Sequence, residues 1–116
     1  ILTTDLPNPT GYGRIIRNND GSLKKIVEEK DATDEERAVY EINSGIYVFN
    51  ARTLFNLLPS VENNNSQNEY YLPDVLNLLI IKKEKVAIDK INNYFEIQGV
   101  NNIEQLNEVN EFFEKP

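Results

Sequence analysis

Two glycines on either side of a tyrosine mark the stretch of this sequence best suited to hold a ligand. Pro9 restricts the backbone to angles typical of a turn, and Gly11 and Gly13 can each adopt a positive φ or leave space where a side chain would not fit. The backbone N–H groups of such a loop can bind carbonyl or phosphate oxygens. The same residues also fit a tight turn that leads into a β-hairpin. The loop alone therefore leaves a ligand site and a plain turn open.

A polar amide stands near the start of the most apolar strand-like run, residues 41–50. A buried amide without hydrogen-bond partners costs about 1–3 kcal/mol, so Asn43 must bind either a ligand or neighbouring backbone. Glu41 lies in the same run. Because successive side chains of a strand point to opposite faces, Glu41 points away from Ile42, and we expect it to be structural.

The composition limits the chemistry that the chain can perform. The sequence contains no Cys and no His, which excludes disulfides, thiolate nucleophiles, histidine bases and the usual zinc sites. A metal ion here must bind to oxygen, which favours Mg²⁺ or Ca²⁺. The net charge of −7 makes duplex nucleic acid an unfavourable partner, whereas a nucleotide accompanied by Mg²⁺ stays possible.

The 116 residues are enough for one small domain, and 40% hydrophobic residues argue against disorder. We see no apolar run of membrane-spanning length and no signal peptide, so we expect a cytoplasmic protein that does not bind membranes. The sequence has no Met and begins at Ile1, which predicts a piece of a longer protein.

Strand and turn signals dominate the first half of the chain. Residues 18–21 (Asn-Asn-Asp-Gly) predict a hairpin turn between strands at residues 12–17 and 23–29, after a first strand at residues 1–4. Thr33 and Glu36 match a capping box, which predicts a short exposed helix. Residues 41–50 predict a strand that is covered on both faces.

Helical spacing dominates the second half. We expect helices that begin near Asn50 and Pro73, strands at residues 85–91 and 94–97, and a last helix capped by Asn102. Strands that alternate with helices predict an α/β or α+β layered domain. Several apolar faces lack a partner within the chain, which also suggests a fragment.

Five motifs, in this order, resemble one enzyme family: PTGYGRI at residues 9–15, IVEEKDAT at 26–33, EINSG at 41–45, NEYYLPD at 68–74 and GVNN at 99–102. The family is the bacterial bifunctional N-acetylglucosamine-1-phosphate uridyltransferase/glucosamine-1-phosphate acetyltransferase. The resemblance covers essentially all 116 residues. It implies the C-terminal, sugar-binding half of a uridyltransferase domain of the nucleotide-diphospho-sugar transferase type, an α/β (Rossmann-like) fold with a mixed sheet flanked by helices.

The resemblance also implies parts that this sequence does not contain. The family's glycine-rich nucleotide loop and its magnesium-binding aspartate would precede Ile1, and a left-handed β-helix domain would follow Pro116. We therefore expect the fragment alone to be inactive and the longer protein to be a homotrimer. The fragment is expected to self-associate through an unpaired sheet edge.

Four residues receive substrate-binding roles from the resemblance. The Gly13 N–H would contact the N-acetylglucosamine unit, and Glu28 would accept hydrogen bonds from sugar hydroxyls, while the adjacent Glu29 is expected to be solvated. Asn43 would bind hydroxyls or the acetamido group, and Tyr71 would form a wall of the pocket. The plain alternatives are a turn glycine, a solvated strand residue, an amide bound to backbone and a core aromatic.

By the resemblance, Asn101 is a fifth substrate-site residue and the second protein ligand of Mg²⁺, through its amide oxygen and together with the upstream aspartate. The alternative is that Asn101 helps to cap the last helix. Many relatives carry a threonine where this chain has Pro73, so no binding role is assigned to Pro73. Arg14 and Lys30 are expected to be solvated and also receive no role.

The implied reaction joins UTP and N-acetylglucosamine 1-phosphate to give UDP-N-acetylglucosamine, a peptidoglycan precursor, and pyrophosphate. Catalysis would depend on positioning and charge neutralisation without a protein nucleophile. Two alternatives remain: a nucleotidyltransferase for another sugar 1-phosphate, and a non-catalytic, self-associating scaffold.

Overall fold

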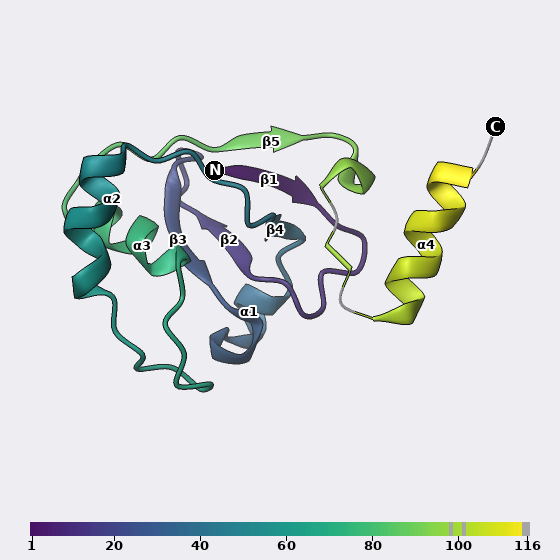
Figure 1. Cartoon of the computed structure of the whole chain (residues 1–116), viewed down its shortest axis with the longest axis horizontal. Helices are drawn as coiled ribbons and strands as arrows, with labels where there is room; N and C mark the ends of the chain where they lie inside the picture. The colour runs from purple at the N-terminus through teal and green to yellow at the C-terminus, as the bar shows by residue number, and fades with distance from the viewer. Residues whose placement is uncertain (98, 101, 115–116) are drawn as a thin grey trace.

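The chain folds around a five-stranded mixed sheet with helices beside it, as the sequence predicts (Figure 1). The computed structural model describes residues 1–97, 99–100 and 102–114. The strands lie in the order β3-β2-β4-β1-β5, with β1 and β5 parallel and the other neighbours antiparallel. The elements are β1 (Leu2–Asp5), β2 (Arg14–Arg17), β3 (Leu23–Val27), η1 (Glu29–Asp31), α1 (Asp34–Arg37), β4 (Glu41–Asn43), α2 (Ala51–Leu57), η2 (Leu58–Ser60), α3 (Pro73–Ile81), β5 (Asp89–Ile91), η3 (Tyr94–Glu96) and α4 (Ile103–Glu114).

Local signals in the sequence set several of these elements. The hairpin turn forms between β2 and β3, where Gly21 adopts a φ of +87° and its N–H donates to the Asn18 carbonyl at 3.0 Å. The capping box forms at α1, because the Thr33 side chain accepts from the Glu36 N–H while the Glu36 carboxylate accepts from the Thr33 N–H. Both features involve residues that are close in sequence.

The main core lies between the β2–β3 hairpin and the helices α2 and α3. The apolar stripe of α3 provides most of its helical side chains, because residues three and four apart share one face. The buried members of this core are Ile15, Leu23, Ile26, Leu57, Val75, Leu76 and Leu79. A second, smaller cluster of Leu6, Tyr12 and Ile42, with Tyr94 packed against it, lies under the loop that precedes β2.

The strand predicted over residues 41–50 is wrong beyond Asn43. β4 covers only Glu41–Asn43, and Gly45 then adopts a φ of +82°, which turns the chain out of the sheet. Val48 in the following segment is 94% exposed, so this run is not covered on both faces.

Two further expectations about the second half need correction. The strand predicted at residues 94–97 is the short helix η3 (Tyr94–Glu96), whose start is capped by Asn93. The strand predicted at residues 85–91 is reduced to β5. The last helix begins after Asn102 as expected, but none of its residues is buried, and it lies beside the sheet-containing body in Figure 1. No helix in the described part of the chain has the length and apolar character needed to span a membrane.

Candidate functional site

The loop at residues 9–13 uses its two glycines for different purposes. Gly11 adopts a φ of +90° with open space around its Cα, so it is required for its backbone conformation. Gly13 has no such angle, but a Cβ there would lie 3.2 Å from Oε1 of Glu28. Gly13 is therefore the point at which backbone without a side chain lies close to the Glu28 carboxylate.

Asn43 lies directly beside this glycine, because its backbone N–H donates to the Gly13 carbonyl at 2.9 Å. Its side-chain Oδ1 accepts from the Gly45 N–H at 3.0 Å and from the Tyr47 hydroxyl at 2.8 Å. The amide oxygen is thus satisfied locally, as the structural alternative predicts. The Nδ2 group donates to no described residue, so it is the part of Asn43 that can serve a ligand.

Glu28 is a half-buried carboxylate without a hydrogen-bonding side-chain partner in the described chain. Burial raises its pKa, and the nearby carboxylates of Asp31, Asp74 and Glu69 raise it further. Such a group gains free energy when it accepts hydrogen bonds from neutral hydroxyl donors. The surroundings of Glu28 therefore suit a polyhydroxyl ligand and disfavour a second anion.

Tyr71 shares a cavity of about 200 Å³ with Glu28, Asp31, Pro73 and Asp74. Its hydroxyl is buried and has no hydrogen-bond partner among the described residues. Burial, followed by the charges of Asp31, Glu69, Glu28 and Asp74, raises the pKa of Tyr71, so it stays a neutral donor at physiological pH. A buried hydroxyl without a partner costs free energy, which a ligand acceptor in the cavity would recover.

Tyr47 belongs to the same constellation, although the sequence predicts it only as part of an apolar strand. Its hydroxyl donates to Asn43, its ring packs against Phe49 at 5.7 Å, and its pKa is raised by burial and also by the charge of Glu28. No sequence signal distinguishes this tyrosine, because its contact with Asn43 depends on the turn at Gly45.

Four of the five predicted residues therefore lie close together. Asn43 donates its backbone N–H to Gly13, and the Glu28 carboxylate lies where a Gly13 side chain would be. Tyr71 lines the same cavity as Glu28. Asn101 lies outside the described residues. The nearby Gly99 carbonyl accepts a hydrogen bond of 2.6 Å from the Tyr12 hydroxyl, one residue before Gly13. This contact joins the first and the fifth of the five motifs, the loop and the GVNN segment.

Of the three residues expected to be solvated, Lys30 is exposed, but Arg14 and Glu29 are not solvated. Arg14 is only 2% exposed, and the Glu29 side chain is 25% exposed and bonded to it. Glu41 is buried and pairs with Arg17, so its expected structural role is confirmed. The sequence could not show that Arg14 points under the loop instead of into solvent.

The described residues do not by themselves form a metal site, since no three acidic, His or Cys side chains among them are placed to hold one ion. The predicted Mg²⁺ ligand is Asn101, which lies outside them.

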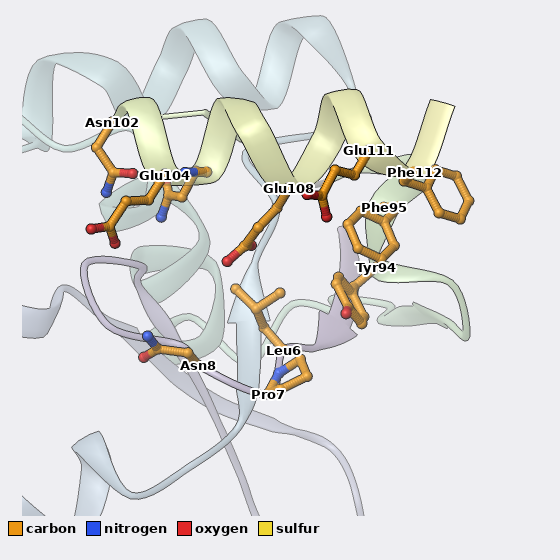
Figure 2. A pocket seen from close by; sticks show the side chains of 11 residues that line it. Leu6, Pro7, Asn8, Tyr94, Phe95, Asn102, Glu104, Glu108, Glu111 and Phe112 are labelled. Atoms are coloured by element: carbon orange, nitrogen blue, oxygen red, sulfur yellow. Dashed lines mark hydrogen bonds between the residues drawn. The ribbon is translucent and has the colours of Figure 1, made fainter. Parts of the chain in front are cut away.

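A larger cavity of about 360 Å³ lies between α4, η3 and the connection after β1 (Figure 2). None of Gly13, Glu28, Asn43 and Tyr71 lines it. Figure 2 shows the carboxylate of Glu108 pointing from α4 toward Leu6, with Glu104 and Glu111 on the same helix. This cavity is therefore separate from the predicted sugar-binding residues and is not the candidate site.

Comparison with known proteins gives a consistent set of relatives, although no family model matches the chain. The chain is 53% identical over 115 residues to the bifunctional protein GlmU of Alkaliphilus metalliredigens, an alignment that covers 99% of this chain and 25% of the relative. It is 55% identical over 108 residues to the protein of the same name from Acetivibrio thermocellus and 52% identical over 108 residues to that of Staphylococcus epidermidis. These alignments cover 93% of this chain and 23% and 24% of the relatives, so the chain spans about a quarter of their length. Nearly the whole chain is thus similar to one part of GlmU, which supports a GlmU fragment.

Proposed function

We propose that this chain is the sugar-binding, C-terminal half of the uridyltransferase domain of a GlmU-type protein. The longer protein would make UDP-N-acetylglucosamine and pyrophosphate from UTP and N-acetylglucosamine 1-phosphate. The observation that carries this proposal is the proximity of Gly13, Glu28 and Asn43, which come from three separate segments. The Asn43 N–H donates to the Gly13 carbonyl at 2.9 Å, and a Cβ added to Gly13 would lie only 3.2 Å from Oε1 of Glu28.

Each group supplies a contact that an amino sugar can use. Glu28 accepts hydrogen bonds from two ring hydroxyls. Its pKa is raised by burial and by the neighbouring carboxylates Asp31, Asp74 and Glu69. The free Nδ2 group of Asn43 and the Gly13 N–H donate to hydroxyl or acetamido oxygens. Tyr71 provides an aromatic wall and a buried hydroxyl without a protein partner.

The role of these residues in the reaction is positioning. An oxygen of the sugar phosphate attacks the α-phosphorus of UTP in line, a P–O bond forms, and the bond to pyrophosphate breaks. Holding the sugar rigidly places its phosphate for this attack and lowers the entropic cost of the reaction. No protein nucleophile is needed, in agreement with a sequence that lacks Cys and His.

Magnesium would neutralise phosphate charge when bound. Asn101 would contribute an amide oxygen, a hard neutral ligand of the type that Mg²⁺ accepts, and the remaining ligands would come from outside this chain. As part of this proposal, the longer protein acts in the cytoplasm as a homotrimer in cell-wall precursor synthesis.

Titration of the isotope-labelled chain with UDP-N-acetylglucosamine and with UDP-glucose, followed by NMR, tests the sugar pocket. We expect the acetylated sugar to shift the amide signals of Gly13, Glu28, Asn43 and Tyr71 more strongly than UDP-glucose does. Gly13→Ala should weaken binding by about tenfold or more, because its Cβ would displace the Glu28 carboxylate.

Asn107→Ala, at an exposed position of α4, serves as the control and should bind as the wild type does. Stronger shifts with UDP-glucose would indicate a nucleotidyltransferase for another sugar. No shift with either nucleotide would contradict the sugar pocket and favour the scaffold alternative.

A further inference from the structure

A buried arginine lies beneath the loop at residues 9–13. Arg14 is 2% exposed, and its guanidinium donates to backbone carbonyls on two sides. Nε donates to the Val39 carbonyl at 3.1 Å and Nη2 to the Arg37 carbonyl at 3.3 Å, while Nη1 donates to the Tyr12 carbonyl in the loop itself. The arginine therefore joins the loop to the segment around the end of α1.

Glu29 completes this connection. Its Oε1 accepts from Nη2 of Arg14 at 3.1 Å, and its Oε2 accepts from the Gly11 N–H at 2.7 Å. Burial opposes ionisation of Glu29, but the Gly11 N–H and the Arg14 guanidinium outweigh it and lower the pKa of the carboxyl. The Glu29 carboxylate thus accepts from the Gly11 N–H of the loop, while Arg14 donates to the Tyr12 carbonyl of the same loop.

The neighbouring glutamate faces the loop at a different point. Glu28 lies against Gly13, where an added Cβ would be 3.2 Å from its Oε1. Because Glu28 and Glu29 are consecutive, the position of the backbone at Glu29 also sets the position of Glu28. The hydrogen bond from the Gly11 N–H to the Glu29 side chain therefore holds the loop beside the segment that carries Glu28.

We propose that Arg14 and Glu29 are a positioning pair that holds the loop at residues 11–13 against Glu28 in the geometry that binds the sugar. This inference rests on the proposed function of Glu28 and Gly13. Neither residue of the pair touches the sugar. The pair acts through the loop, and the planar fork of arginine is required because it serves three carbonyls and a carboxylate at once.

A pair that only stabilised the fold would behave differently from a positioning pair. Loss of a pair that only stabilised the fold would lower the free energy of unfolding and would make amide hydrogens throughout the core exchange faster. Loss of a positioning pair should instead accelerate exchange at the loop and weaken sugar binding while the amides of β2 and β3 stay protected.

Glu29→Gln and Arg14→Lys test the pair, with Glu35→Gln and Arg52→Lys as matched controls at exposed positions. In each variant of the whole chain, amide exchange at Gly11 and Ile15 and the affinity for UDP-N-acetylglucosamine are measured by NMR. For Glu29→Gln we expect exchange at Gly11 to be about tenfold faster, unchanged exchange at Ile15 and affinity about tenfold weaker. Arg14→Lys should act in the same direction, and both controls should resemble the wild type.

Unchanged amide exchange at Gly11 in Glu29→Gln would overturn the proposal that the pair positions the loop. Faster exchange at Gly11 together with unchanged affinity for the sugar nucleotide would also overturn it. Equal acceleration at Gly11 and Ile15 would show a purely stabilising role and would also overturn it. If Arg14→Lys does not fold, Glu29→Gln decides, because it conserves the size of the side chain. If the wild type binds no sugar nucleotide, the proposed function fails, while exchange at Gly11 still decides whether the pair holds the loop.

Discussion

At the scale of single residues, the carboxylates of this chain divide into two groups according to their partners. Glu41 and Glu29 are bound to arginines and to hydrogen-bond donors, which outweigh the effect of burial and lower the pKa of each. Glu28 has no such partner, and burial beside Asp31 and Asp74 raises its pKa. This difference separates Glu41 and Glu29, which hold the fold together, from Glu28, the carboxylate that we propose binds the sugar.

Glu28→Gln should make the chain more stable at neutral pH. A pKa raised in the folded state means that Glu28 favours folding below its unfolded pKa and that this contribution is lost as the pH rises through the folded pKa. Because Glu28 is half-exposed, the effect is modest, and we expect Tm at pH 7 to rise by about 2–4 °C, with a smaller rise near pH 4. Thermal unfolding followed by circular dichroism at both pH values checks this.

Glu35→Gln at an exposed position of α1 is the control and should change Tm little at either pH. A lower Tm for Glu28→Gln at pH 7 would show that Glu28 is a structural residue and not a carboxylate kept for a ligand.

At the scale of elements, the free edge of the sheet at β3 is covered by a side chain from α3. The Asn77 Oδ1 accepts from the Ile26 N–H at 2.9 Å, and its Nδ2 donates to the Ile26 carbonyl at 3.0 Å. The amide thereby imitates the pairing of a neighbouring strand. This contact ties α3 to the hairpin and holds the start of the segment that carries Glu28.

Asn77→Ala should destabilise the chain by about 1–3 kcal/mol, because the Ile26 N–H and carbonyl lose their partner in a half-buried position. Urea unfolding monitored by circular dichroism measures this difference. Asn107→Ala, on the exposed surface of α4, should change the free energy of unfolding by less than about 0.5 kcal/mol. Equal stability of the two variants would mean that the contact with Ile26 contributes nothing.

At the scale of the whole molecule, apolar surface is left open where the chain leaves β4. Val48 is 94% exposed and Ile46 is 44% exposed, and the backbone of residues 47–49 makes no hydrogen bond with described backbone. An apolar extended segment with unpaired backbone groups is prone to pair with another strand. This segment is the most direct support for the expected self-association of the chain.

Val48→Lys should therefore shift the chain toward the monomer in sedimentation velocity measured over a series of concentrations. Charge at this position blocks the approach of a second strand, as lysine does on natural sheet edges. Ile103→Lys makes the same change at another highly exposed apolar residue, on α4, and should leave the distribution as in the wild type. A wild-type chain that stays monomeric at every concentration would contradict the expectation.

The sequence alone determined the features that depend on neighbours along the chain. The Thr33–Glu36 capping box, the hairpin turn at Gly21 and the starts of α2 and α3 form from hydrogen bonds and side-chain spacing within a few residues. The α/β class with a mixed sheet followed from the alternation of these elements and from the resemblance.

Only the tertiary structure determined which residues are buried and which residues far apart in sequence contact each other. Periodicity could not show that β4 ends at Asn43, that residues 94–96 form a short helix, or that Arg14 lies buried under the loop, because each outcome depends on segments far away in sequence. The same holds for the contact of Gly13 with Glu28 and for the edge cover by Asn77. Local hydrogen bonds can be predicted from adjacent residues, whereas desolvation and packing are properties of the folded chain.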